Sequence, residues 1–165
     1  MSEESPKTEY VRFEGEADFQ KAVDLLLEQS GRELRIFDPD LAALRLNSPE
    51  RVAQFERFLR GSRTRRIQFV VHHSEHVMHH CPRMMGLLKL FNHAIQINRT
   101  HEEIRRLQDA FLVLDAAHYV RRPVAAHFRG GVGLNDEAEA QVMRSRFLEI
   151  WAESYPGVAS TTVGL

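Results

Sequence analysis

Apolar residues recur along this chain with two alternating periods. Spacings of three and four residues, typical of amphipathic helices, cover four segments: about Ala17–Gln29, Pro49–Gly61, the stretch opened by Pro82, and Asn135–Trp151. Between them lie short runs of strand-forming residues: Leu34–Phe37, Ile67–Val71, Ala94–Ile97 and Phe111–Leu114. Helices that alternate with short apolar strands predict an α/β sandwich, in which helices flank a mixed β-sheet.

The last helix has well-defined start and face signals. Asn135 is expected to cap it, because the acids that follow suit the positive end of a helix dipole. One apolar stripe is expected along it: Ala140, Met143, Phe147 and Ile150 or Trp151. We predict that this stripe packs on the sheet that contains Phe111–Leu114, with Phe147 and Trp151 as the principal anchors.

Length and composition indicate one soluble domain. The 165 residues, 43% of them apolar, suffice for one core. We expect a flexible segment at 1–10, the α/β domain at 11–155 and a tail at 156–165. The 22 basic and 23 acidic residues give no global attraction to nucleic acid or membranes. A single cysteine, no membrane span and no signal peptide lead us to expect a cytoplasmic protein.

The stretch from Gln108 to Asp115 surrounds the most apolar of the predicted strands. Its spacing resembles the phospholipase D superfamily, in which His-x-Lys-x4-Asp lies across such a strand. Aligned on Asp115, the histidine position holds Gln108 and the lysine position holds Ala110. Of the three motif residues, this chain keeps the aspartate alone.

Two further motifs extend the resemblance over about residues 105–154. Asn135-Asp136-Glu137 corresponds to the Asn-x-Glu step of the superfamily, and Phe147 with Trp151 to its closing aromatic pair. Between Asp115 and Asn135 the chain departs from the pattern, with Arg122-Pro123 and Ala125 in place of Gly-Ser and Asn. The resemblance implies a phospholipase D-like fold with a single half, and therefore a homodimer if two halves are to face one another.

The resemblance also implies that the family's chemistry is lost. In the superfamily a histidine attacks phosphorus, a lysine offsets phosphate charge and an aspartate orients its partners. The amide of Gln108 is neither nucleophilic nor titratable near neutral pH, and Ala110 offers no charge. We therefore expect a non-catalytic domain, without a cofactor, that binds a partner or associates with itself.

A cluster just after Asp115 offers an alternative site. His118, Arg121 and Arg122 are candidates to bind an anionic small molecule or a protein partner through charge-assisted hydrogen bonds. In a strand, the two arginines point to opposite faces, so only one lines a given pocket. The alternative interpretation is a solvent-exposed turn with local ion pairs.

A histidine-rich tract runs from His72 to His80 and carries metal-ligand chemistry. In a short helix His76 and His80 share one face, with His72 or His73 just outside it. The tract lacks the His-Glu-x-x-His spacing of a zinc motif, so a polar loop and helix are preferred and no metal is expected. The competing enzyme hypothesis is a divergent phosphodiesterase or a metal-dependent hydrolase that uses His118 or this tract.

The single cysteine lies in a motif that has two interpretations. Cys81-Pro82-Arg83 suits either a reactive thiolate at a helix start or a small buried residue, and we prefer the second. With the Phe111–Asp115 strand, this step resembles an uncharacterised bacterial domain that sometimes follows acetyltransferase domains.

Two arginine groups precede strands and are expected to share one solvated edge of the sheet: Arg63, Arg65, Arg66 and Arg99, Arg105, Arg106. Because acids are interspersed and aromatic side chains are missing there, they give no strong nucleic-acid signal.

Overall fold

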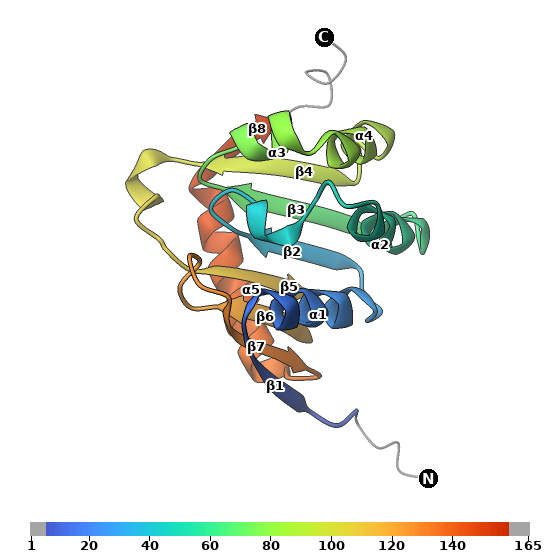
Figure 1. Cartoon of the computed structure of the whole chain (residues 1–165), viewed down its shortest axis with the longest axis vertical. Helices are drawn as coiled ribbons and strands as arrows, with labels where there is room; N and C mark the ends of the chain where they lie inside the picture. Colours follow the sequence, from blue (N-terminus) through green and yellow to red (C-terminus); the bar gives the residue numbers. More distant parts are fainter. Residues whose placement is uncertain (1–5, 159–165) are drawn as a thin grey trace.

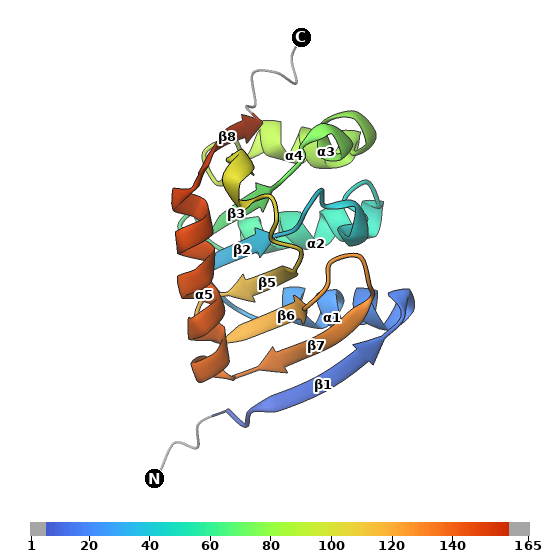
Figure 2. The same cartoon turned by 90° about the vertical axis from the view of Figure 1, so that its left-hand side faces the viewer.

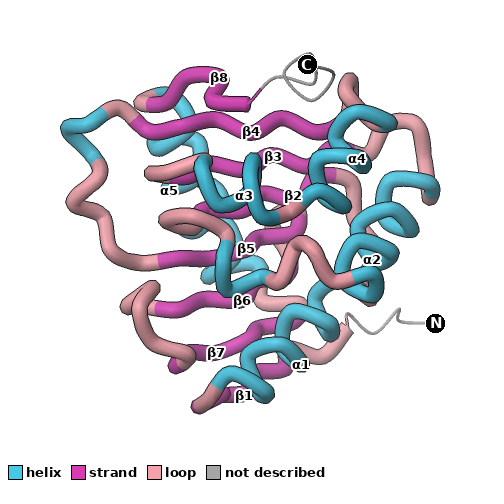
Figure 3. Tube along the Cα trace, turned by 45° about the horizontal axis from the view of Figure 1, so that its top comes forward, coloured by secondary structure: helices cyan, strands magenta, loops and turns pink. Residues whose placement is uncertain are grey.

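One mixed sheet of eight strands runs through the whole molecule (Figure 1). The computed structural model describes residues 6–158. The strands are β1 (Glu9–Glu14), β2 (Glu33–Phe37), β3 (Arg66–Val71), β4 (Ile95–Thr100), β5 (Ala110–Leu114), β6 (His118–Arg122), β7 (Arg129–Leu134) and β8 (Ser154–Val158). Their order across the sheet is β1-β7-β6-β5-β2-β3-β4-β8 (Figure 3). Neighbours β2, β3 and β4 run parallel, and the other pairings are antiparallel.

Helices cover the two faces of the sheet unequally. They are α1 (Glu16–Leu27), α2 (Pro49–Arg60), α3 (Glu75–His80), α4 (Pro82–Leu90) and α5 (Glu137–Ala152). Figure 2 shows α5 alone on one face and the other helices on the opposite face. Each face has its own hydrophobic core, and the one under α5 is the smaller. The predicted α/β sandwich with a mixed sheet is therefore confirmed.

The predicted helices and apolar strands correspond to observed elements. Ser48 caps α2 by accepting a hydrogen bond from the backbone N–H of Arg51, and Pro49 occupies the first helical position. The start of α5 differs from the prediction by one residue. Asp136, not Asn135, is the cap, and its carboxylate accepts from the N–H of Glu139. Asn135 instead takes a left-handed conformation with φ of 55°.

The apolar stripe of α5 packs on β5 as predicted, with one exception. Phe147 is fully buried in the core under α5, together with Phe111. Trp151 is only partly buried and stacks on Phe147, with 5.8 Å between ring centroids. Phe147 is therefore the main anchor, and the expectation that Trp151 anchors equally is wrong.

Three strands lack the expected strand pattern. β1 is exposed along most of its length, and β8 includes Pro156 and Gly157 at the other edge of the sheet. β7 contains glycines because its neighbours leave no room for side chains. A Cβ on Gly133 would lie 2.4 Å from the ring of Tyr119. β1 starts within the segment expected to be flexible, and β8 extends past the expected domain end.

The two arginine groups lie at opposite ends of the central strands. Arg63 and Arg65 precede β3, whereas Arg105 and Arg106 precede β5. Since β5 runs antiparallel to β2, it starts at the edge where the parallel strands end. The expectation of one shared basic edge is therefore wrong.

Candidate functional site

Polar side chains from distant parts of the chain gather at the edge of the sheet formed by the carboxyl ends of β2, β3 and β4. Asp38 follows β2 and His72 follows β3. Because Phe37 pairs with Phe111, the residues that lead into β5, Gln108 and Asp109, lie beside the end of β2. The end of β6 reaches the same edge. In open α/β sheets, ligands bind at the carboxyl ends of parallel strands.

Gln108 stands at this edge, where the superfamily pattern places its histidine. Its side chain is exposed and lines a cavity of about 440 Å³. Its backbone carbonyl accepts a hydrogen bond of 2.6 Å from the N–H of Ala125. Ala110 is buried within β5, with 3% of its surface exposed, so no charged side chain reaches the cavity from that position.

A buried ion pair between Asp38 and Arg122 forms the inner wall of this cavity. Both side chains are 4% exposed. Asp38 Oδ1 also accepts from the backbone N–H groups of Leu41 and Asp40, at 2.8 and 3.1 Å. Burial raises the pKa of Asp38, and the charge of Arg122 opposes that shift. The Asp38 carboxylate therefore connects the turn after β2 to the end of β6.

Arg122 is engaged in contacts within the fold. One of its terminal nitrogens bonds Asp38, and Nη1 donates to the carbonyl of Ala125 at 2.5 Å. Its guanidinium lies over the rings of Phe19 and Phe128, at 4.7 and 5.8 Å from their centroids. This arginine is a structural link between β6, the turn after β2 and α1.

The cavity in front of Gln108 is lined by acidic groups. Glu16, Asp38 and Asp40 contribute carboxylates, against the single guanidinium of Arg122. Glu16 is paired at 2.9 Å with exposed Arg45. A phosphate approaching Gln108 would meet negative charge, the opposite of what phosphodiester chemistry needs.

Asp109 also serves the fold. It forms a two-pronged ion pair with Arg146 of α5, one contact being 2.8 Å between Arg146 Nη2 and Asp109 Oδ1. The hydrogen bond to Asp109 raises the pKa of Arg146. This pair ties α5 to the start of β5.

His72 reaches the same edge, but both ring nitrogens are engaged. Nε2 lies 2.8 Å from the carbonyl oxygen of Leu107, and Nδ1 lies 2.7 Å from Thr100 Oγ1. Burial lowers the pKa of His72, so the neutral ring is favoured. The ring stands edge-on to Phe37.

The remaining histidines of the tract are less buried than His72. His73 and His80 are exposed, and His76 is partly buried on α3. The rings of His76 and His80 share one face, with centroids 5.5 Å apart. Within residues 6–158, no three His, Cys, Asp or Glu side chains gather in an arrangement that would hold a metal ion.

The predicted ligand site is not assembled in one place. His118 and Arg122 begin and end β6, so they lie at opposite edges of the sheet. Arg121, between them, is exposed on the face covered by α5 and lines a separate hollow with Tyr119. The structure therefore does not bring His118, Arg121 and Arg122 together.

Asp115 and His118 are each occupied by backbone groups. Asp115 has a φ of 53° and accepts from the N–H groups of Arg32 and Glu33, at 3.0 and 2.9 Å. His118 Nδ1 accepts from the N–H of Asn135 at 3.0 Å. Burial lowers the pKa of His118, and the charge of Asp115 opposes that shift. Asp115 thus fastens the end of β5 to the start of β2.

Cys81 is buried, with 1% of its surface exposed, and burial raises the pKa of its thiol. That environment favours the thiol over the thiolate. It matches the preferred interpretation of a small buried residue at the start of α4.

Sequence reasoning missed the two ion pairs that organise the candidate edge. Asp38 belongs to no motif recognised in the sequence, and Arg122 was predicted only as a ligand-binding residue. The signal available was weak: an acid directly after a predicted strand, and one of two adjacent arginines. Pairing them required the antiparallel β5–β6 hairpin, which places Arg122 beside Ala110.

Solved structures of low sequence identity share this fold. TrmBL2, an archaeal chromatin protein, superposes with a TM-score of 0.64 and 11% identity over 90% of this chain and 54% of that protein. Nuc, a phospholipase D family member from Salmonella typhimurium, gives 0.64 and 9% over 93% of this chain and all of that one. NucT from Helicobacter pylori gives 0.59 and 10% over 92% of this chain and all of that one.

The predicted resemblance is thus confirmed: the chain has a phospholipase D-like fold with a degenerate motif. No helix among residues 6–158 is long and apolar enough to cross a bilayer. No curated protein sequence matches this chain. Residues 15–159 match the family described as "Domain of unknown function (DUF7931)", and that match covers most of the sequence. This phospholipase D-like chain belongs to that family of domains of unknown function.

Proposed function

We propose that this domain is a non-catalytic phospholipase D-like domain that acts by binding or self-association rather than by cleaving phosphodiesters. The observation that carries the proposal is the cavity in front of Gln108. An amide stands where the superfamily pattern has its nucleophile, and three of the lining side chains are carboxylates. The one cation there, Arg122, is already neutralised by Asp38.

The environment of the other candidate catalytic groups supports the same proposal. His72 and His118 are buried, and each contributes ring nitrogens to hydrogen bonds that hold the fold. A general base needs to reach the proton it removes, and a nucleophile needs to reach phosphorus. Neither imidazole lines the cavity in front of Gln108. The alternative of a divergent phosphodiesterase or metal-dependent hydrolase therefore has less support.

Two comparisons support a binding or self-associating role. One solved structure of this fold is from a chromatin protein and concerns DNA binding. The chain matches Nuc over that protein's whole length, as expected for one complete unit of the fold. In the superfamily two such units face one another, so self-association is part of the proposal. Sedimentation equilibrium measures it directly, with a dimer expected. An association with acetyltransferase domains stays a prediction.

Hydrolysis of bis-p-nitrophenyl phosphate tests the non-catalytic proposal. The purified chain is expected to release p-nitrophenol no faster than buffer, with or without added Zn²⁺ or Mn²⁺. Turnover that disappears in His118→Ala would contradict the proposal in favour of a divergent phosphodiesterase. Metal-dependent turnover that disappears in His76→Ala/His80→Ala would contradict it in favour of a hydrolase. His127→Ala, which removes an exposed histidine elsewhere, is the matched control.

A further inference from the structure

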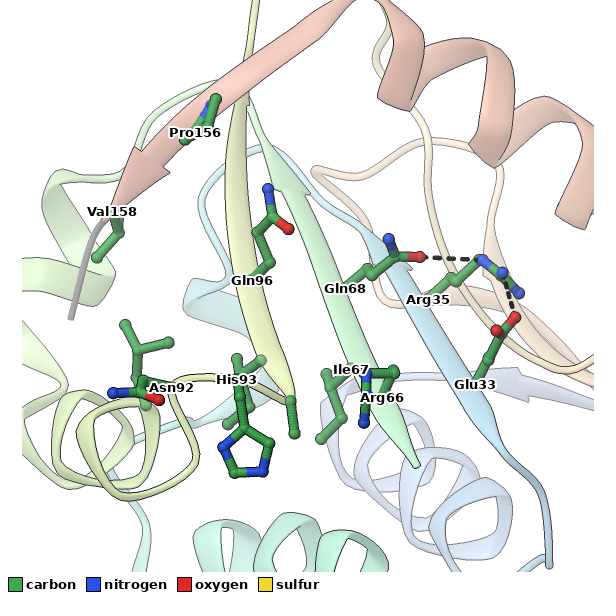
Figure 4. A pocket seen from close by; sticks show the side chains of 13 residues that line it. Glu33, Arg35, Arg66, Ile67, Gln68, Asn92, His93, Gln96, Pro156 and Val158 are labelled. Atoms are coloured by element: carbon green, nitrogen blue, oxygen red, sulfur yellow. Dashed lines mark hydrogen bonds and ion pairs between the residues drawn. The ribbon is translucent and has the colours of Figure 1, made fainter. Parts of the chain in front are cut away.

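The sheet face that carries α5 is open over the first halves of β2, β3 and β4. There Arg35, Gln68 and Gln96 pair in register, so their side chains form one row across three central strands. Figure 4 shows this row with Asn92 and His93 below it in the view and with Pro156 and Val158 of β8 toward the upper left. The space between them is a cavity of about 520 Å³. Small-molecule sites commonly have this size.

A polar row is unusual on central parallel strands. Such strands are normally apolar on both faces. The opposite face follows that rule, with fully buried residues such as Ile36, Phe69 and Ile97. Three long polar side chains in the middle of a sheet therefore need hydrogen-bonding groups that the hydrophobic core does not supply.

The hydrogen bonds within the row leave ligand-binding capacity. Gln68 Oε1 accepts from Arg35 Nε at 3.2 Å, and Gln96 Nε2 donates to Asn98 at 3.0 Å. Among the described residues, no bond engages Gln68 Nε2 or Gln96 Oε1. These two amides therefore present a donor and an acceptor to the cavity.

Arg35 is the buried charge of the site. Its side chain is 7% exposed and pairs with Glu33, while its Nη1 is buried with no hydrogen-bond partner among the described residues. Buried guanidinium donors are normally paired. At the mouth of the cavity, Arg66 and His93 are exposed. Arg66 Nη1 is held by the carbonyls of Arg63 and Arg65, both at 3.1 Å. The cavity thus has two arginines against one carboxylate.

We infer that this cavity binds a small organic oxyanion, a phosphate or carboxylate that also carries hydroxyl or amide groups. The charged group lies at the mouth between Arg66 and His93, and the polar remainder lies over Gln68 and Gln96. The site is at the start of the parallel strands, opposite the edge that holds Gln108. It therefore stands or falls independently of the non-catalytic proposal.

Nuclear magnetic resonance titration at low salt tests the inference, with ribose 5-phosphate and citrate as the two probes. Saturable shifts of the Gln68 and Gln96 side-chain amide signals are expected with at least one probe. Binding of ribose 5-phosphate alone identifies a phosphate ligand, and binding of citrate alone identifies a carboxylate ligand. Either result supports the inference.

Variants distinguish the cavity from general surface charge. Arg66→Ala/His93→Ala is expected to weaken binding at least tenfold. Glu33→Gln is expected to tighten it several-fold, because Glu33 is the one carboxylate among the described residues that line the cavity and its negative charge is removed. Arg105→Ala/Arg106→Ala removes two charges at the other edge and is expected to leave affinity unchanged. Absence of saturable shifts with both probes, or equal losses in both double variants, would overturn the inference.

Discussion

At the scale of single residues, the ion pair of Asp38 and Arg122 dominates the edge that holds Gln108. Both charges are removed from water, and their desolvation is offset by one another, by backbone N–H groups and by the Ala125 carbonyl. Such a pair is worth little compared with an apolar replacement of both partners. Removing one partner, however, leaves the other charge buried and uncompensated.

Arg122→Met is therefore expected to lower the free energy of unfolding by about 3–5 kcal/mol near neutral pH. Without Arg122, burial holds the folded-state pKa of Asp38 above its ordinary value of 3.8. Between pH 3.8 and the raised pKa, the folded variant binds more protons than the unfolded chain. Its stability therefore falls as pH rises from 3.8 through the folded-state pKa of Asp38. Urea denaturation at pH 4 and 7.5 is expected to show the smaller deficit at pH 4. A deficit no larger than that of exposed Arg121→Met would contradict this role.

The two buried histidines make an opposite pH prediction. Burial lowers the pKa of His72 and of His118 below the ordinary value of 6.5. The unfolded chain therefore binds protons first, so the stability is fully present above that value and is lost as pH falls through it. Thermal melts from pH 7.5 to 5 are expected to show a falling midpoint.

A matched pair of variants assigns this pH dependence. His72→Asn/His118→Asn is expected to melt at a lower temperature but with a flatter pH profile. His93→Asn, which changes an exposed ring, is expected to keep the wild-type profile. An unchanged slope in the double variant would show that other groups cause the acid loss.

At the scale of elements, α5 is the only α-helix on its face of the sheet among the described residues. Phe147 fills the core between α5 and β5, Trp151 covers the edge of that core, and Glu149 faces solvent. Phe147→Ala is expected to cost about 3–5 kcal/mol, and Trp151→Ala clearly less. Glu149→Ala is expected to change stability by less than about 0.5 kcal/mol. Thermal or urea unfolding of the three variants checks this order, which equal losses would contradict.

Elements with a strong local pattern were predictable from the sequence, and the glycine-rich and edge strands were not. α2 is announced by Ser48 and Pro49, and β5 by four consecutive apolar residues. β7 has no such pattern, because close packing against Tyr119 requires Gly133. That requirement arises from the tertiary structure, so no local signal reveals it.

At the scale of the whole molecule, the antiparallel insertion of β5 beside β2 decides where the candidate groups lie. It carries Gln108 to the ends of the parallel strands and Asp115 to their beginnings. The spacing of Gln108, Ala110 and Asp115 was readable from the sequence, and so was the loss of catalytic side chains. The separation of His118 from Arg122 was not, because it depends on both ends of the five-residue strand β6 being used for structural contacts.

The same topology gives the molecule two distinct polar sites. The cavity in front of Gln108 is rich in carboxylates, whereas the cavity on the open sheet face has Arg35 and Arg66 against Glu33. An anion is therefore favoured at the second site and disfavoured at the first. This distribution of charge between the two cavities is the main physical reason for the proposal that the domain acts by binding.

The proposal that the domain carries out no phosphoryl transfer is tested most directly by looking for the covalent intermediate itself. The superfamily resemblance implies a phospho-histidine, which adds mass to the chain and needs no sustained turnover to be seen. After incubation with bis-p-nitrophenyl phosphate and rapid quenching, intact-mass spectrometry is expected to show the unmodified chain alone. Attack by a histidine would release one p-nitrophenolate and leave a p-nitrophenylphosphoryl group on the ring; such an adduct that maps to His118, His72 or another histidine, and disappears when that residue is replaced by alanine, would contradict the account.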